Sequence, residues 1–419
     1  MVRLSGAGTG NVVRRLAGSL PAPRTAALKR LRHPETGETL DRALALWFPG
    51  PRSYTGEDCA ELHLHGGPAV IAGVAEALVA AGARPAEAGE FTRRAFTHGK
   101  MDLTAAEGIA DLVAAETAAQ RRQALRQAEG GLAALYGGWM GRLTGLLARQ
   151  EASIEFETED LPPDLDAAVG RGAAALRAEM EAHLADGDRG ERLREGLVAA
   201  ILGAPNAGKS SLLNALVGRD AAIVSARAGT TRDVVEARLD LGGVPVTLAD
   251  TAGLREASDE VEAEGVRRAL LRAEAADLRL LVFAADRPPD SGTLALVAPG
   301  ALVVVNKTDL GPAPAEIGGV AAVPVSVRTG EGLPALRDRL TAAAADLARP
   351  ETATPLTRGR HRAALREALA CLADLDSAEL PELRAECLRA ASAALGRITG
   401  RVGIEAVLDA VFREFCIGK

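Results

Sequence analysis

The chain has 419 residues, of which 49 are Lys or Arg and 56 are Asp or Glu, so its net charge is −7. At roughly 150 residues per domain, this length predicts about three domains. The acidic balance excludes a strongly basic nucleic-acid module, although not a local basic patch. Hydrophobic residues make up 47% and charged residues 25%, which excludes a disordered chain. Aromatic residues make up only 3%, too few for a platform that stacks several bases.

Cysteine usage and hydropathy indicate a cytoplasmic protein. The four cysteines, at 59, 371, 387 and 416, show neither metal-ligand spacing nor the density of a disulfide framework. Free thiols in a reducing compartment are therefore expected. No apolar run reaches the roughly 18 residues that cross a bilayer, and the N-terminus has no secretory signal. We expect a cytoplasmic location and no membrane partner.

The apolar periodicity predicts helices in four parts of the chain. Short strands and turns come first, together with a helix over residues 69–81. Apolar residues at three- and four-residue steps between Leu132 and Leu147 form one face of a long helix. A further helical run is expected over residues 166–193, and helical spacing returns after Pro350. Strands alternate with helices in between, so a helical domain interrupted by an α/β domain is predicted.

Residues 203–210, with the sequence G-A-P-N-A-G-K-S, fit the pattern G-x-x-x-x-G-K-[ST]. They follow an apolar strand and open an apolar helix, which is the context of a P-loop rather than of a chance Gly-rich turn. Main-chain N–H groups of such a loop bind phosphates. Lys209 is expected on the β- and γ-phosphate oxygens, and Ser210 on Mg²⁺. The predicted nucleotide contacts here are Asn206, Ala207, Gly208, Lys209, Ser210 and Ser211.

Two later motifs, each after an apolar strand, predict contacts to Mg²⁺ and the γ-phosphate and a guanine base, respectively. Asp250 begins the sequence D-T-A-G, in which the carboxylate reaches Mg²⁺ through water and the Gly253 N–H reaches the γ-phosphate. Asp309 ends the sequence N-K-T-D, and its carboxylate can accept hydrogen bonds from both N1–H and N2–H₂ of guanine. Adenine offers no such pair, so the site discriminates. The predicted contacts are Asp250, Thr251, Ala252, Gly253, Asn306, Lys307, Asp309 and the partly matching loop Ser326, Val327 and Arg328.

The sequence suggests an unusual way of orienting the attacking water. Leu254 occupies the position at which Ras-type enzymes carry a water-orienting Gln, and an apolar side chain cannot perform that role. Thr231 lies in a Gly-containing loop that could close on Mg²⁺. Glu262 is a candidate for bridging to the water, although the residues alone favour a solvated helix face for it.

Taken together, these motifs resemble those of the MnmE family of bacterial tRNA modification GTPases. The matching blocks cover essentially the whole chain, and the N- and C-terminal ones are specific to the family. They comprise residues 48–58, 65–68, 89–96, 100–107, 205–210, 228–233 and 250–262, and the terminal F-C-I-G-K at 415–419. The resemblance implies an α/β multidomain fold. It has a small tetrahydrofolate-binding-like and dimerisation domain at residues 1–99, and a P-loop G domain at 196–349 inserted into an all-helical domain formed by 100–195 and 350–419.

The resemblance further implies that K⁺ and G-domain dimerisation activate GTP hydrolysis in place of an external arginine finger. A fixed cation stabilises the charge that develops between the β- and γ-phosphates. The family assigns water orientation to the position of Glu262, which raises it above the solvated-face interpretation. Lys209, Thr231, Glu262 and Cys416 are thus the expected catalytic residues. Mg²⁺ is expected on Ser210 and Thr231, K⁺ on Asn206, Ser225, Arg227 and Thr230, and nucleotide also on Ser225, Gly229, Thr230 and Thr231.

The N-terminal domain of the family implies a folate site. A 5-formyl- or 5,10-methylene-tetrahydrofolate is expected as the one-carbon donor, with Arg3, Glu61, Lys100 and Lys419 at the matching positions. The carboxylate of Glu61 suits the 2-amino-4-oxo edge of a pterin, and a cationic side chain suits the anionic glutamate tail. The family usually carries a further strand and a Pro/Gly-rich turn before the position of Arg3, whereas Met1 here lies two residues before it. Either the start is assigned too late or this version is truncated, and the two alternatives bear on the first sheet and the folate pocket.

The implied reaction is modification of carbon 5 of the wobble uridine in certain tRNAs to carboxymethylaminomethyluridine. The chain would act as a homodimer, joined through its N-terminal domain, in a heterotetramer with the FAD-binding partner MnmG. FAD would belong to that partner, because this sequence has no dinucleotide fingerprint. Two alternatives are a GTP-switched ribosome-assembly or RNA-binding GTPase and a folate-binding structural module. The N-terminal blocks and the C-x-G-K end disfavour the first of these.

Three further groups have both a functional and a structural interpretation. Cys416 lies near Lys419, where an ammonium favours a thiolate, but it is equally consistent with a small buried residue of the last helix. Arg358, Arg360 and Arg362 could contact tRNA phosphates, although the solvated start of a helix is favoured. His63 and His65 share one side of a strand, and without a third ligand nearby a structural role is favoured over a metal site.

Overall fold

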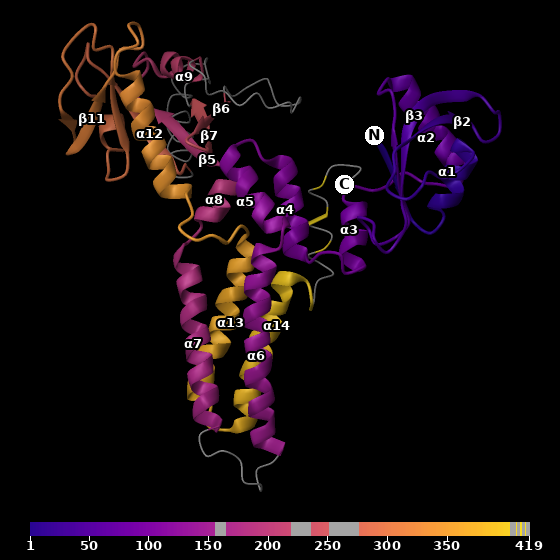
Figure 1. The fold of residues 1–419 in the computed structure, drawn as a ribbon. Helices are drawn as coiled ribbons and strands as arrows, with labels where there is room; N and C mark the ends of the chain where they lie inside the picture. The colour runs from indigo at the N-terminus through magenta and orange to yellow at the C-terminus, as the bar shows by residue number, and fades with distance from the viewer. Residues whose placement is uncertain are drawn as a thin grey trace, which may run out of the picture. The chain divides into compact units, whose positions relative to one another are not determined.

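The computed structural model describes residues 1–155, 165–218, 236–250, 276–402, 408, 411–412 and 415. The chain divides into two compact units, whose elements are labelled in Figure 1. Unit 1 comprises Met1–Val113, Leu125–Ala173 and Ala370–Lys419, and unit 2 comprises Ala114–Ala124 and Ala174–Leu369. Each is described by itself, and the domain limits expected from the sequence stay predictions.

The N-terminal part of unit 1 is a four-stranded antiparallel sheet covered on one face. Its order is β1-β4-β3-β2, with β1 at Val2–Ser5, β2 at Ala27–Arg32, β3 at Thr39–Phe48 and β4 at Cys59–His63. Helices α1 (Thr9–Ala17) and α2 (Pro68–Ala80) pack on the face that carries Leu31, Trp47 and Leu62, because alternate strand residues point to one side. The predicted small α/β domain and its helix are confirmed.

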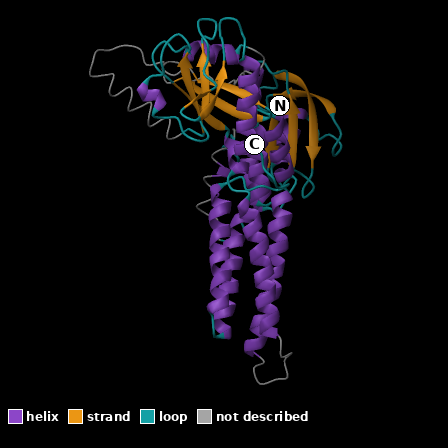
Figure 2. Ribbon diagram, turned by 90° about the vertical axis from the view of Figure 1, so that its left-hand side faces the viewer, coloured by secondary structure: helices purple, strands orange, loops and turns teal. Residues whose placement is uncertain are grey.

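The rest of unit 1 is helical. Its elements are α3 (Glu90–Thr97), α6 (Gly131–Glu155) and α14 (Pro381–Thr399), together with α4 (Leu103–Ala114) up to Val113 and parts of α5 (Ala118–Ala128), α7 (Leu165–Ala185) and α13 (Gly359–Ser377). Along α6 the buried residues Leu132, Tyr136, Trp139, Leu143 and Leu146 form the apolar face that the spacing predicted. That helix lies against α14, and Figure 2 shows the long helices side by side.

One predicted helix is divided in two. The expected run over residues 166–193 ends at Ala185, and α8 (Arg189–Glu195) begins only after Gly187. Gly187 has φ +70°, a left-handed conformation that terminates a right-handed helix. Apolar residues on both sides of this glycine keep helical spacing, so periodicity alone did not reveal the break.

Unit 2 contains a seven-stranded sheet, ordered β10-β11-β9-β8-β5-β7-β6. Its strands are β5 (Leu197–Leu202), β6 (Glu236–Leu241), β7 (Val244–Asp250), β8 (Leu278–Ala284), β9 (Leu302–Asn306), β10 (Glu316–Ile317) and β11 (Val320–Pro324). The five central strands are parallel, and β6 and β10 are antiparallel edges. The predicted α/β insertion is thus confirmed.

Both faces of this sheet are covered. Ala199 and Ile201 of β5 join a core with α9 (Lys209–Val217) and α12 (Leu333–Ala348), whereas Ala200 and Leu202 belong to a second core on the other face, near α11 (Ser291–Leu294). A near-continuous apolar strand such as β5 is typical of a parallel sheet buried on both faces. Since parallel strands end at the same edge, the segments that follow β5, β7, β9 and β11 meet there.

Two expectations about the whole chain concern its cysteines and its hydropathy. Cys59, Cys371 and Cys387 are free thiols, as predicted, and Cys416 lies outside the described residues. Among the helices that the structure describes, none combines the length and apolarity needed to cross a bilayer.

Candidate nucleotide and folate sites

The loop after β5 is shaped by two glycines that have no room for a side chain. Gly203 has φ +156°, and a Cβ there would lie 2.3 Å from the carbonyl oxygen of Val282. Gly208 has φ +94°, and its Cβ would lie 2.2 Å from Nδ2 of Asn306. Asn206 between them also has positive φ, +63°. Glycine is the residue that allows such a turn and such close approach, so the residues present fit a main-chain phosphate cradle.

Lys209 is buried at the start of α9 and points back onto this loop. Its Nζ donates to the carbonyl oxygens of Gly203 at 2.8 Å and Ala204 at 2.9 Å. Ser210 and Ser211 follow in the first turn of the helix, where main-chain N–H groups have no partner within the helix. The predicted phosphate-binding and Mg²⁺-binding groups of this segment therefore gather at one helix N-terminus, a favourable place for anions.

Asn306 joins the P-loop to the two loops predicted to bind the base. It is only 2% exposed. Its Nδ2 donates to the carbonyl of Ala207 at 3.0 Å, and its Oδ1 accepts from the main-chain N–H groups of Lys307 at 2.8 Å and Val327 at 3.3 Å. A buried amide with donor and acceptor satisfied fixes the distance between these three loops.

Asp309 and Ser326 form the second contact between the base loops. Ser326 is fully buried, and its Oγ donates to Oδ1 of Asp309 at 2.7 Å. The exposed guanidinium of Arg328 lies 3.5 Å from Oδ2. The hydrogen bond from Ser326, helped by Arg328, lowers the pKa of Asp309 below its usual value. At neutral pH this side chain is therefore a carboxylate, the form that accepts hydrogen bonds from guanine.

Asp286, at this edge of the sheet, was not predicted from the sequence. Its partner is Lys307, which has φ +64° and whose Nζ donates to Oδ2 of Asp286 at 2.9 Å. That hydrogen bond lowers the pKa of Asp286. Asp286 follows β8 by two residues, and so it lies at the same edge as the motifs after β5 and β9. A carboxylate just after a buried parallel strand was the available signal.

Several predicted residues cannot be placed. Asp250 ends β7 and is paired through its backbone with Ile201 of β5, but its side chain is outside the description. The remaining predicted residues of the nucleotide, K⁺ and one-carbon sites that lie outside the described residues are Ser225, Arg227, Gly229, Thr230, Thr231, Thr251, Ala252, Gly253, Glu262, Cys416 and Lys419.

Two predicted folate residues, Arg3 and Glu61, bind each other. They are directly opposite on β1 and β4. Nε and Nη2 of Arg3 donate to Oε1 of Glu61 at 3.0 and 2.9 Å, and the guanidinium lies 5.2 Å from the ring centre of Tyr54. Lys100 instead donates to the carbonyl of Pro51 at 3.0 Å. The structure thus brings Arg3 and Glu61 together, and it does not bring Lys100 to them.

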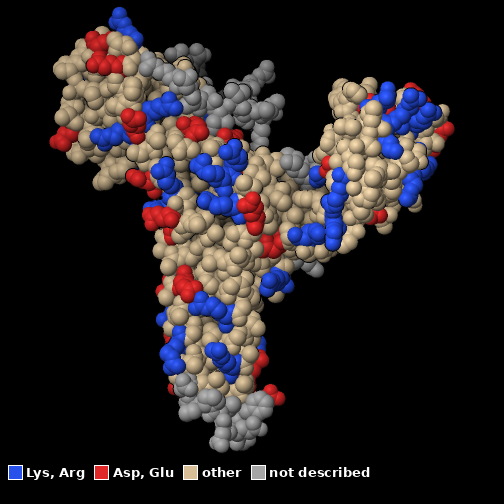
Figure 3. Space-filling view, viewed as in Figure 1, with Lys and Arg blue, Asp and Glu red and all other residues tan. Residues whose placement is uncertain are grey.

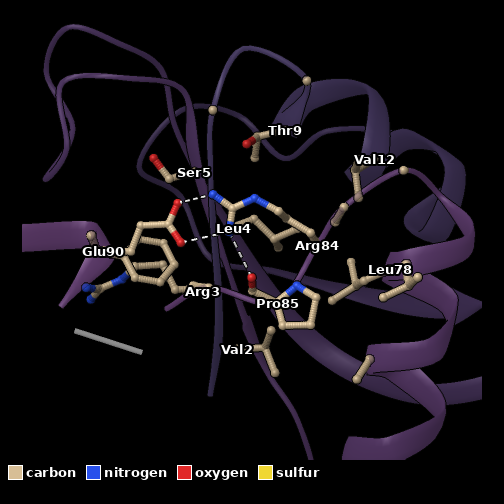
Figure 4. Close-up of a pocket in the computed structure, with 18 of the residues that line it drawn as sticks. Val2, Arg3, Leu4, Ser5, Thr9, Val12, Leu78, Arg84, Pro85 and Glu90 are labelled. Atoms are coloured by element: carbon tan, nitrogen blue, oxygen red, sulfur yellow. Dashed lines mark hydrogen bonds and ion pairs between the residues drawn. The ribbon is translucent and has the colours of Figure 1, made fainter. Parts of the chain in front are cut away.

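Two cavities of unit 1 separate these residues further. The first, of about 600 Å³, is lined by β1, α1, α2 and residues 82–86, and Arg3 is in its wall (Figure 4). Lys100 lines the second, of about 630 Å³, together with Met101 and Arg401. Both volumes are in the range of small-molecule sites. Glu61 lines neither, so the folate residues expected from the resemblance do not share one cavity here.

A charge network, which the sequence did not reveal, forms one wall of the first cavity. Arg84 donates to Glu90 at 2.9 Å, as Figure 4 shows. Glu90 also accepts from Arg94 at 2.7 Å, and Arg94 reaches Glu57 at 2.9 Å. The hydrogen bonds from Arg84, with those from the main chain of Glu87 and from Arg94, lower the pKa of Glu90 to about 2. This wall is charged across the physiological pH range.

The end of the chain reaches α4. Phe412 and Phe415 pack in a cluster with Leu103 and Ala106. Phe415 directly precedes Cys416, and Leu103 follows Lys100 by three residues. Phe412 and Phe415 therefore pack against the start of α4.

The basic run at the start of α13 is not a solvated helix start. Arg358 is buried, and Arg362 forms an ion pair with Glu191 at 2.9 Å. The expectation of a solvated face is therefore wrong for these two residues, because α8 supplies a carboxylate that the local sequence does not show. The structural role expected for His65 is supported by its contact with Asp41 at 2.7 Å. No cluster of three or more metal-ligating side chains occurs among the described residues.

Comparisons with known proteins decide the family. The profile described as the MnmE helical domain matches residues 103–416, and that of the GTP-binding protein TrmE N-terminus matches residues 1–100. The tRNA modification GTPase MnmE of Gluconacetobacter diazotrophicus is 59% identical over 422 residues, covering 100% of this chain and 95% of its own. That of Granulibacter bethesdensis is 54% identical, covering 100% and 96%. The chain belongs to the MnmE family of tRNA modification GTPases.

Family membership confirms the P-loop GTPase interpretation of the inserted domain, and with it GTP hydrolysis as the activity. The ribosome-assembly alternative is not supported, since the matches extend through the N-terminal and helical parts of the chain. A solved structure of Era from Aquifex aeolicus bound to GDP and AlF4− is 28% identical, covering 44% of this chain and 69% of its own, at a TM-score of 0.29. That score is too low to support any conclusion.

Asp309→Asn is expected to exchange the base preference. The amide would replace one acceptor by a donor, so it would no longer accept from both N1–H and N2–H₂ of guanine, while it could donate to the 2-oxo group of xanthine. Affinity for GDP should fall about 100-fold, and affinity for xanthosine diphosphate should rise. Isothermal titration calorimetry measures both. The exposed Glu316→Gln is the matched control, and an unchanged GDP affinity in Asp309→Asn would contradict the assignment.

Glu90→Gln is expected to weaken unit 1 in a pH-dependent way. Because the pKa of Glu90 is lowered from 4.5 to about 2, its stabilisation is present above about pH 4.5 and is lost as the pH falls toward 2. The free energy of unfolding should drop by about 2 kcal/mol at pH 7, and the difference from the parent should shrink at pH 3. Urea titrations at the two pH values measure this, with the exposed Glu38→Gln as control. An equal deficit at both would refute the role of the charge.

Proposed function

We propose that this tRNA modification GTPase binds Mg²⁺–GTP across the edge of its parallel sheet and hydrolyses it with the help of K⁺. The observation that carries the proposal is the buried amide of Asn306, which joins the P-loop to the loops of Asp309 and Ser326. In this arrangement the phosphates lie on the main chain of the P-loop and the N-terminus of α9. The base lies against Asp309, at the opposite end of the same site.

Each described group has a definite task in this reaction. Lys209 is held near the phosphates by its own loop, so it needs only to turn from the carbonyls of Gly203 and Ala204 to reach an oxygen of the triphosphate. Ser210 offers its hydroxyl to the metal ion at the first turn of α9. Asp309 and Asn306 fix the base and thereby the register of the phosphates. Thr231 and Glu262 are proposed for metal binding and water orientation.

K⁺ is proposed to replace an arginine finger. When bound, the ion supplies positive charge between the β- and γ-phosphates. Among the described residues, Asn206 would hold the ion. It has positive φ within the P-loop, and its side chain is exposed beside the residues expected to bind phosphate. Ser225, Arg227 and Thr230 are proposed to supply further ligands from their loop. The side-chain amide oxygen of Asn206 and nearby main-chain carbonyl oxygens are the kind of ligands that fit such an ion.

GTP hydrolysis is expected to be at least about tenfold faster in K⁺ than in Na⁺ of equal ionic strength. Asn206→Gly keeps the backbone conformation but removes the amide oxygen, so this ratio should fall toward one while the KM for GTP changes little. Asn214→Ala, on the exposed side of α9, should behave as the parent. Steady-state phosphate release gives the three ratios. Equal rates in the two salts for the parent protein would remove K⁺ from the mechanism.

We further propose a tetrahydrofolate donor, dimerisation through the N-terminal sheet and cooperation with the FAD-binding MnmG on the tRNA wobble uridine, in the cytoplasm. Support for dimerisation comes from the sheet face opposite α1 and α2, where the cross-strand neighbours Leu28 and Leu44 are 59% and 45% exposed. Exposed apolar pairs of this kind favour a protein interface. Arg3 and Glu61 lie on β1 and β4 of the same sheet, which supports a folate site there.

Glu61→Gln tests the folate proposal. Loss of the carboxylate removes both the partner of Arg3 and the acceptor for the pterin edge, so the Kd for 5-formyltetrahydrofolate should rise about tenfold or more. Calorimetry on the full chain gives the value, and GTP hydrolysis should be unaffected. Glu38→Gln, on an exposed turn, is the control. An unaltered Kd in Glu61→Gln would place the folate elsewhere, with the cavity lined by Lys100 as the next site to examine.

A further inference from the structure

Helix α5 begins with a reciprocal cap formed by two buried side chains. Thr117 directly precedes the helix and Gln120 is its third residue. The main-chain N–H of Gln120 donates to Oγ1 of Thr117 at 3.2 Å, and the N–H of Thr117 donates to Oε1 of Gln120 at 3.1 Å. Both residues are less than 10% exposed. This arrangement is a capping box, which satisfies main-chain donors at a helix start.

The remaining donors of the two capping side chains bind main-chain carbonyls elsewhere in unit 2. The Thr117 hydroxyl donates to the carbonyl of Gly243 at 2.6 Å, and Nε2 of Gln120 donates to the carbonyl of Arg194 at 2.9 Å. One turn later, Nε2 of buried Gln123 donates to the carbonyl of Gly190 at 2.9 Å. This end of α5 is therefore hydrogen-bonded both to the turn between β6 and β7 and to α8.

The opposite face of α5 has a different character. Arg121 and Arg122 are exposed, and Figure 3 shows basic side chains gathered over this helix. A helix that buries glutamines instead of leucines depends on specific hydrogen bonds rather than on non-directional apolar contact.

The turn of the β6–β7 hairpin packs closely against the start of α5 and against α12. Gly242 and Gly243 have φ +65° and +96°, and a Cβ on Gly243 would lie 3.0 Å from the Cβ of Ala119. A Cβ on Gly242 would lie 2.9 Å from Cγ2 of Thr341 in α12. Farther along β6, Arg238 donates to both oxygens of Glu116 at 2.6 and 2.7 Å. The segment of residues 116–123 thus contacts both the turn and one strand of the hairpin.

The other end of the hairpin leads to the nucleotide. β6 directly follows residues 219–235, which include the predicted ligands Thr230 and Thr231, and β7 ends at Asp250, just before residues 251–275. One end of the hairpin therefore adjoins, in sequence, the segments expected to contact the γ-phosphate, and its turn contacts the residues that cap α5. Its two strands are paired from Glu236 opposite Ala249 to Leu241 opposite Val244.

The capping segment is also the place where the chain passes between the two units. Residues 114–124 belong to unit 2, whereas α4 up to Val113 and α5 from Leu125 belong to unit 1. Within unit 1, Gln127 donates to the carbonyl of Thr104 at 2.9 Å. A Cβ on Gly108 would lie 2.4 Å from the N–H nitrogen of Ala128, so α4 and the end of α5 are in close contact.

We propose that Glu116, Thr117 and Gln120 are positioning residues. Their contacts with the β6–β7 hairpin and α8 couple the nucleotide state of the G domain to the conformation of the helical domain. The inference rests on the proposed nucleotide site and adds to it the contact through which hydrolysis is coupled to tRNA modification. A change at the γ-phosphate displaces the hairpin. The carbonyl of Gly243 moves with it, and α5 follows because its cap is bonded to that carbonyl.

Thr117→Asp is designed to keep the helix cap of α5 while removing the hydrogen bond to the Gly243 carbonyl. The carboxylate still accepts the N–H of Gln120, but it cannot donate to the Gly243 carbonyl and repels it. Hydrogen–deuterium exchange of the full chain is measured with GDP and with a non-hydrolysable GTP analogue. In the parent protein, peptides covering residues 103–128 should differ in exchange between the two nucleotides. In Thr117→Asp that difference should disappear, GTP hydrolysis should stay within about twofold, and tRNA modification should fall tenfold or more.

Two control variants complete the experiment. Thr117→Ser keeps cap and donor and should restore the parent's behaviour, whereas Asp290→Ala removes an unrelated cap in the G domain and should leave the coupling intact. Persistence of the nucleotide-dependent difference in Thr117→Asp overturns the inference. So does its absence from a parent protein that hydrolyses GTP. A parent that binds no guanine nucleotide would instead refute the proposed site itself, so the two failures are distinguishable.

Discussion

The hydrogen bond from Asn306 to the carbonyl of Ala207 is the contact on which the proposed nucleotide site depends. It connects two loops separated by 99 residues in sequence, which follow β9 and β5 of the sheet. Gly208 is required by the same contact, because a Cβ there would occupy the space of the Asn306 amide. If this amide were lost, the P-loop would keep its glycines but not its distance from Asp309. A nucleotide must span that distance, so affinity and base selectivity share one structural cause.

The parallel sheet makes this contact possible, and it explains why much of the site could be predicted from the sequence. Parallel strands end at one edge, so motifs after β5, β7, β9 and β11 converge whatever their separation along the chain. Each motif could thus be placed from its preceding apolar strand alone. The ion pair of Lys307 with Asp286 could not be predicted in this way. It depends on the positive φ of Lys307 and on the neighbouring position of β8 in the strand order, neither of which has a local signature.

In the N-terminal part, the resemblance predicted which residues bind folate but not which of them contact one another. Arg3, Glu61 and Lys100 were each assigned to folate by position. Whether Arg3 meets Glu61 depends on the register of β1 against β4, and a shift by one residue would turn them to opposite faces. Arg84 and Glu90 escaped notice because their pairing joins a loop to a helix. The break of the predicted helix at Gly187 has a related origin, since apolar spacing reports which face is buried and not whether the backbone is continuous.

The start of α5 combines a local signal with a long-range consequence. The sequence T-A-A-Q at residues 117–120 matches a capping box, a pattern of neighbouring residues that marks a helix start. A capping box accounts for the main-chain donors of the helix, but it leaves one hydroxyl hydrogen and one amide group unassigned. In a solvated helix, water would take them. Here both are buried and both bind main-chain carbonyls, that of Gly243 in the β6–β7 turn and that of Arg194 in α8, which are 126 and 74 residues away. The local motif therefore predicts the helix start, whereas the burial of its spare donors shows that this helix start also contacts the β6–β7 turn and α8. The proposed coupling rests on this contact.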